Sequence, residues 1–154
     1  MTVSVRETAF DPYAELAAHE RRCFPRPGAF GASANFIGTM RDLNEGDAVT
    51  QMTLEHYPGM TERHLERICA EARARWGLLE TLVIHRVGAL LPGDPIVLVG
   101  VWSAHRAEAF TACRHIMEDL KSQAPFWKKE VTGQGERWVS RNTSGEAREA
   151  PDGE

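Results

Sequence analysis

The sequence contains few lysines and few cysteines, and it lacks long hydrophobic runs. Its three cysteines, Cys23, Cys69 and Cys113, are widely spaced and form no CxxC motif. This argues against a disulfide framework or a zinc ribbon and favours reduced thiols. The longest apolar run, Ile96 to Trp102, is far shorter than the roughly 20 residues that a membrane helix needs. The first residues also lack the hydrophobic segment of a signal peptide. We therefore expect a cytoplasmic protein without a membrane address.

Several functional classes are unsupported. The net charge of −4 argues against a general nucleic-acid binder, which normally presents a basic face. The sequence has no P-loop and no GxGxxG motif. His56 and His64 are not accompanied by an HxxxH motif or by paired carboxylates, so we expect no metal site and no resident cofactor. A local basic site for a small anion remains open.

The hydrophobic patterns predict one α+β domain with an antiparallel or mixed sheet and two main amphipathic helices. The main helices are expected from about Leu65 to Trp76, closed by Gly77, and from about Arg106 to Ser122. A shorter helix is expected after Asp11-Pro12. The expected strands are Val3–Val5, Phe30 to about Arg41, Val49–His56 (which returns after a turn), Leu79–Val87, Ile96–Ser103, Phe126–Val131 and Arg137–Val139. We expect residues 1–139 to form the domain and residues 140–154 to form a polar, mobile tail.

The scarce lysines are clustered. Lys121, Lys128 and Lys129 lie within nine residues, whereas the other fifteen basic residues are arginines. An amine can lose its proton near neutral pH when burial or neighbouring cations lower its pKa, and a guanidinium cannot. The cluster therefore suggests acid/base or nucleophilic chemistry. Two simpler interpretations remain open, a cation at a helix C-terminus and an edge strand protected by lysines.

The helical pattern places Lys121 beside packed apolar side chains. The centre of the apolar stripe falls at Ala109, Cys113, Ile116 and Leu120, with Phe110 and Met117 widening it on the side where Arg114 and Lys121 lie. Pro125 ends the helix. Strand alternation then sends Phe126 and Lys128 to one face and Lys129 to the other, so Lys128 can return toward Lys121.

Two further segments suggest anion binding. In Ser103-Ala104-His105-Arg106 a buried strand gives way to a helix, and such junctions expose backbone N–H groups. Gly38-Thr39-Met40-Arg41 offers a similar arginine at the end of another strand. His85-Arg86 lies within β structure and is interpreted as structural.

Five segments in order resemble one family, the large catalytic subunit of molybdopterin synthase, over roughly residues 30 to 139. They are FIGTMRDLNEGDAV (36–49), LEHYPGM (54–60), IHRVGALLPGD (84–94), VGVWSAHRAEAF (99–110) and LKSQAPFWKKE (120–130). The resemblance implies an α/β-hammerhead fold and a homodimer within a heterotetramer. It also implies a sulfurtransferase of molybdenum-cofactor biosynthesis. A small ubiquitin-like sulfur-carrier subunit would supply sulfur from its C-terminal thiocarboxylate to cyclic pyranopterin monophosphate (precursor Z), giving the dithiolene of molybdopterin.

The resemblance also assigns residues. Lys121 and Lys128 match the family's catalytic lysines, and the implied substrate-binding residues are Thr39, Met40, Arg41, His105, Arg106, Lys121, Lys128, Lys129 and Glu130. Lys121 would hold the incoming carboxyl terminus, Lys128 would move protons, and the arginines with His105 would neutralise the phosphate. Part of the pocket can come from the dimer partner.

Two other hypotheses stay open. One is a non-catalytic module that binds the C-terminus of a ubiquitin-like partner. The other is an unrelated enzyme that forms a Schiff base on a lysine. Clustered amines together with anion-binding arginines favour sulfur transfer.

Overall fold

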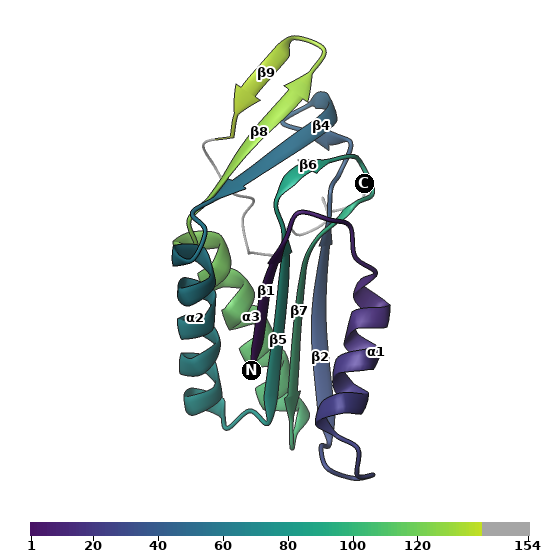
Figure 1. The fold of residues 1–154 in the computed structure, drawn as a ribbon, viewed down its shortest axis with the longest axis vertical. Coiled ribbons are helices and arrows are strands. Elements are labelled where there is room, and N and C mark those ends of the chain that lie inside the picture. Colours follow the sequence, from purple (N-terminus) through teal and green to yellow (C-terminus); the bar gives the residue numbers. More distant parts are fainter. Residues whose placement is uncertain (140–154) are drawn as a thin grey trace, which may run out of the picture.

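The computed structural model describes residues 1–139, which contain nine strands and three helices arranged around two sheets (Figure 1). This α+β architecture confirms the predicted class. The predicted tail, residues 140–154, lies outside the described residues. Among residues 1–139, no helix is long and apolar enough to cross a membrane.

The first sheet is mixed and has the strand order β1-β5-β7-β2, in which only β1 and β5 are parallel. Helices α2 and α3 cover one face, and α1 covers the other (Figure 1). The bounds of these elements are β1 Thr2–Arg6, α1 Pro12–Cys23, β2 Ala32–Thr39, α2 Met60–Trp76, β5 Glu80–Arg86, β7 Pro95–Ser103 and α3 Arg106–Gln123. Because helices pack on both sides, β5 and β7 are almost continuously buried.

Alternation along β7 divides the core between the two faces. Val99 and Val101 pack with α2 and α3, whereas Leu98 and Trp102 pack with α1. Gly100 lies between them, and a Cβ there would stand 2.9 Å from the Cδ2 atom of Leu16 on α1. The missing side chain therefore lets α1 approach the sheet closely.

The helix ends follow the expected capping chemistry. Asp11 Oδ1 accepts hydrogen bonds from the backbone N–H groups of Tyr13 and Ala14 at 3.0 and 3.2 Å, so Asp11 is the N-cap of α1. Gly77 closes α2 with the left-handed φ of 59° that glycine adopts at low cost. Both caps were predicted from the sequence.

The second sheet is built around β4 (Asp47–His56), which pairs with three strands, β3 (Leu43–Asn44), β6 (Gly88–Leu90) and β8 (Phe126–Thr132). The predicted final hairpin is confirmed, with β9 (Gly135–Trp138) pairing with β8. The returning strand exists, but it joins this second sheet instead of running back along β2. A small core of Met40, Val49, Met52, Leu54 and Leu90 contacts Ile96 at the start of β7 and so joins the two sheets.

Candidate functional site

A cavity of about 130 Å³ lies where the two sheets meet. It is formed by the end of β2, the β3–β4 hairpin, β8 and the last turn of α3. Its lining residues are Thr39, Met40, Arg41, Leu43, Asn44, Val49, Met52, Ile96, Lys121, Lys128, Glu130 and Val139. The fold thus brings together six of the nine predicted site residues, which come from three separate segments of the chain.

The lysine pair is the chemically distinctive part of this cavity. Burial, the positive charge of Lys128 and a hydrogen bond to the Lys128 side chain together lower the pKa of Lys121 from 10.5 to about 8. At about pH 7.5, roughly a quarter of such an amine is neutral, against roughly 0.1% for an ordinary lysine. Lys121 can therefore both carry charge and exchange protons near neutral pH. The contact also confirms that Lys128 turns back toward Lys121.

The connection between α3 and β8 fixes the geometry of the pair. Ala124 N–H donates to the carbonyl of Leu120 at 3.2 Å, and Phe126 N–H donates to the carbonyl of Ala124 at 2.9 Å. The intervening carbonyl of Pro125 accepts from Thr61 Oγ1, at the start of α2, at 3.4 Å. This turn is thereby tied to a second helix, so the two lysines sit on a constrained frame.

His85 is a buried neighbour of the lysines. Its ring stacks on Phe126 with 3.9 Å between centroids, and its Nδ1 lies 2.7 Å from the carbonyl oxygen of Arg86, to which it donates. Desolvation lowers the pKa of His85 to about 3, and the charges of Lys121 and Lys128 act in the same direction. The imidazole is therefore neutral at neutral pH. Its structural role was predicted from the sequence, but its place beside the lysines was not.

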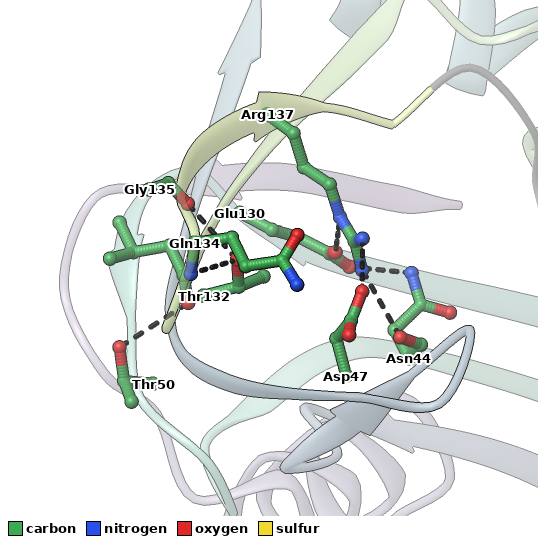
Figure 2. Close-up of polar contacts among 9 residues, drawn as sticks. Asn44, Asp47, Thr50, Glu130, Thr132, Gln134, Gly135 and Arg137 are labelled. Carbon is green, nitrogen blue, oxygen red and sulfur yellow. Dashed lines mark hydrogen bonds and ion pairs between the residues drawn. The ribbon is translucent and has the colours of Figure 1, made fainter.

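Glu130 forms part of the cavity wall and is held by a polar network (Figure 2). Asn44 Nδ2 donates to Glu130 Oε1 at 2.8 Å, and Arg137 Nε donates to Oε2 at 3.2 Å. Arg137 also reaches Asp47 Oδ2 at 2.7 Å and the carbonyl of Asn44 at 3.1 Å. Both oxygens of the buried carboxylate thus face donors, which satisfies a group that is costly to bury alone. Arg137, Asn44 and Asp47 were missed from the sequence. The network joins two hairpins that are distant in the chain, with 86 residues between Asn44 and Glu130 and 90 between Asp47 and Arg137.

Two backbone hydrogen bonds fix the end of β2 in the cavity wall. Met40 N–H donates to the carbonyl of Asp94 at 2.9 Å, and Gly93 N–H donates to the carbonyl of Met40 at 2.8 Å. Met40 is buried by this arrangement, whereas Thr39 and Arg41 on either side are exposed. Arg41 can therefore meet an anion that enters from solvent.

Three predicted site residues lie elsewhere. Lys129 is on the opposite face of β8 from Lys128; its Nζ lies 3.4 Å from Glu136 Oε2 and 5.6 Å from the Trp138 ring centroid. His105 and Arg106 stand at the start of α3, whereas Lys121 lies in its last turn. Fifteen helical positions separate Arg106 from Lys121, a rise of about 22 Å. Within one chain, these three residues do not reach the cavity.

A shallow groove of about 560 Å³ runs between α3 and β2, the edge strand of the first sheet. Phe36 and Phe110 line it and are 42% and 69% exposed. The expectation that Phe110 widens the buried stripe is therefore wrong for this chain alone, although Met117 is buried as predicted. The reason is that, within residues 1–139, the first sheet ends at β2 and no further strand of that part covers this side of α3.

Comparison with known proteins gives a consistent result. The family model described as "MoaE protein" matches residues 5–123. The chain is 56% identical over 145 residues to a molybdopterin synthase catalytic subunit of Ralstonia nicotianae, covering 94% of this chain and 80% of the relative. It is 50% identical over 148 residues to the protein of the same name in Pseudomonas aeruginosa, covering 96% and 95%. The solved structure of a molybdopterin biosynthesis MoaE protein from Burkholderia ambifaria superposes with a TM-score of 0.76 at 48% identity, covering 93% of this chain and 92% of that one.

Proposed function

The chain belongs to the MoaE protein family, and from that premise we propose that it is the catalytic subunit of a molybdopterin synthase, a sulfurtransferase. A small ubiquitin-like sulfur-carrier subunit would present its C-terminal thiocarboxylate, and cyclic pyranopterin monophosphate would receive the sulfur to give the dithiolene of molybdopterin. The observation that carries this proposal is the hydrogen-bonded pair of Lys121 and Lys128 inside the cavity.

The two amines suit different steps. An incoming thiocarboxylate is an anion, so it favours the charged form of Lys121 and is held as an ion pair. Lys128 neighbours this amine and is assigned the proton transfers that accompany opening of the cyclic phosphate and addition of sulfur. Glu130, fixed by Arg137 and Asn44, keeps the wall of the cavity in place.

The partner subunit follows from the relatives and from the site. The relatives' name, "catalytic subunit", implies a further subunit in those enzymes. The cavity is small, with a volume of about 130 Å³, which suits a narrow chain end better than a folded surface. Capture of a terminal carboxylate by a cation is an established way of recognising such an end. The absence of a resident cofactor and the cytoplasmic location stay predictions.

A second copy of the chain is proposed to complete the site. Ala32 pairs with Ser103, close to His105, whereas Thr39 at the other end of β2 lines the cavity. Two copies of β2 pairing antiparallel, the more frequent arrangement, would place the Ala32 end of one copy beside the Thr39 end of the other. The second copy's His105 and Arg106 would then face the first copy's cavity. Such a dimer would also cover the exposed rings that line the groove beside β2.

Mixed dimers test this shared site. Lys121→Ala and Arg106→Ala should each abolish activity alone. After the two variants are mixed and reassorted, about a quarter of the wild-type activity should return, since half of the dimers then hold one intact site. Phe110→Glu should yield monomers in sedimentation analysis. Free exchange of subunits without any recovery would mean that His105 and Arg106 do not act across a dimer.

Reconstitution tests the proposed activity and separates it from the non-catalytic alternative. The purified protein, thiocarboxylated small subunit and cyclic pyranopterin monophosphate should give the sulfurated pterin in a mass spectrum. The same mixture with an unmodified carboxylate on the small subunit is the control and should give none. A tight complex of the two subunits that makes no sulfurated pterin would support a binding module instead.

A further inference from the structure

A second cluster of chemically active side chains lies at the opposite end of the first sheet from the lysine cavity. His19 and Cys23 are one helical turn apart near the end of α1, and Glu80 is the first residue of β5. His19 is 2% exposed, and the Glu80 side chain is 14% exposed. Cys23 Sγ lies 3.5 Å from His19 Nε2 and 3.7 Å from Glu80 Oε2. The three candidate ligand atoms all lie within 4.8 Å of one another.

The two separations from the Cys23 sulfur match those in a tetrahedral metal centre. Zinc bonds of about 2.3 Å to sulfur and about 2.05 Å to nitrogen or oxygen, at an angle of about 109°, put sulfur about 3.6 Å from either other ligand. Both sulfur separations fall within about 0.2 Å of that value, given the bond lengths above. The ligand types also suit zinc, which binds thiolate, imidazole and carboxylate together.

Neighbouring groups already orient the carboxylate. Glu80 Oε1 accepts from Thr81 N–H at 2.7 Å and pairs with Arg73 Nη1 at 3.5 Å and with the terminal amine of Met1. Oε2 is thereby directed toward Cys23. Outer contacts of this kind are typical of metal ligands, because they fix the ligand before the metal arrives.

We propose that His19, Cys23 and Glu80 form a site for one divalent cation of zinc type. A thiolate and a carboxylate together neutralise the charge of the cation, and water would fill the fourth position. Binding would release the thiol proton into solvent and shift the ring hydrogen of His19 from Nε2 to Nδ1, with no change of oxidation state. The cation would tie the end of α1 to the start of β5.

Arg22 contacts His19 in a way that opposes metal binding. Its Nη2 lies 2.9 Å from His19 Nδ1, so Nδ1 accepts and Nε2 carries the hydrogen that faces Cys23. A metal on Nε2 requires the other tautomer, in which Nδ1 carries the hydrogen and can no longer accept from Arg22. Arg22 is exposed, so its side chain has room in solvent to move away from His19. Arg22 thus competes with the metal, and its removal should strengthen binding.

Spectroscopic titration with Co²⁺, a stand-in for zinc, tests the site in the untagged full-length chain after treatment with a chelator. The wild-type protein should bind one Co²⁺ per chain, with a near-ultraviolet thiolate-to-cobalt band and visible bands of tetrahedral strength. Cys23→Ala and Glu80→Gln should lose the thiolate band. Cys113→Ala, which removes a buried thiol on α3, should keep it.

Two further measurements complete the test. Arg22→Gln should bind Co²⁺ at least about tenfold more tightly, in line with effects of outer-shell groups. Saturating Zn²⁺ should raise the Tm of the wild-type protein and of Cys113→Ala but not that of Cys23→Ala. Absence of a thiolate band in the wild-type protein, or a band that survives Cys23→Ala, would show that the cluster is only hydrogen bonded and would overturn the proposal.

Discussion

Replacing Lys121 with methionine should make the folded protein more stable at neutral pH. The folded-state pKa of about 8 lies below the ordinary 10.5, and this difference of about 2.5 units corresponds to about 3 kcal/mol. Partial exposure of the amine to solvent reduces the net effect to about 1–2 kcal/mol. Well below pH 8 the amine is charged in both states, so the folded protein bears the full cost of holding a buried ammonium. Between pH 8 and 10.5 the unfolded chain binds more protons, and wild-type stability therefore rises with pH.

Urea unfolding of Lys121→Met and the wild type, at equal protein concentration, checks this at pH 7 and at pH 10.5. The variant should gain about 1–2 kcal/mol at pH 7, equivalent to about 3–6 °C in Tm, and most of that gain should vanish at pH 10.5. Lys129→Met is the matched control: its amine pairs with Glu136 across the outer face of β8, so no such gain is expected. A variant less stable than the wild type at pH 7, or a gain independent of pH, would refute the reasoning.

Three shorter predictions follow from single contacts. Lys128→Met should raise the pKa of Lys121 by about one unit. Acylation of Lys121, followed by mass spectrometry as a function of pH, should then show a higher pH midpoint. An unchanged midpoint would rule out electrostatic coupling of the pair. Arg137→Met should lower the midpoint of urea unfolding, because buried Glu130 loses a charged donor. An unchanged midpoint would mean that the network does not stabilise the fold. Gly31→Ala should lower the free energy of unfolding by about 1–3 kcal/mol. A Cβ at this position would stand 2.2 Å from a backbone carbonyl oxygen in the loop before α3. A variant as stable as the wild type would contradict this close approach.

Local chemistry explains why the element boundaries were predictable. Asp11 and Gly77 mark helix ends through contacts within a few residues, and Pro125 separates α3 from β8. The alternation that sends Lys128 and Lys129 to opposite faces is likewise a local property of a strand. Such features depend on neighbours in sequence and can be recognised without knowing the rest of the fold.

Pairing between distant segments was not predictable in the same way. The pattern of β4 predicts a strand, but nothing within it indicates that its partners are β6 and β8. His85 is buried in β5 and distant in sequence from Lys121, so only the packed structure shows that they are neighbours. Conversely, Arg106 and Lys121 lie on one predicted helix, and the length of that helix separates them. The resemblance to a family supplied the set of site residues, and the structure divides that set among the cavity, the outer face of β8 and the start of α3.

Sulfur transfer by lysine variants tests the central claim most directly. Lys121→Ala, Lys128→Ala and the control Lys129→Ala would each be mixed with thiocarboxylated small subunit and cyclic pyranopterin monophosphate, and the sulfurated pterin would be quantified by mass spectrometry. The first two should lose at least about 100-fold in rate, in keeping with the loss of a proton-transfer group. Lys129→Ala should stay near the wild type, and all three should remain folded by circular dichroism. Wild-type rates in a Lys121→Ala and Lys128→Ala double variant would contradict the account.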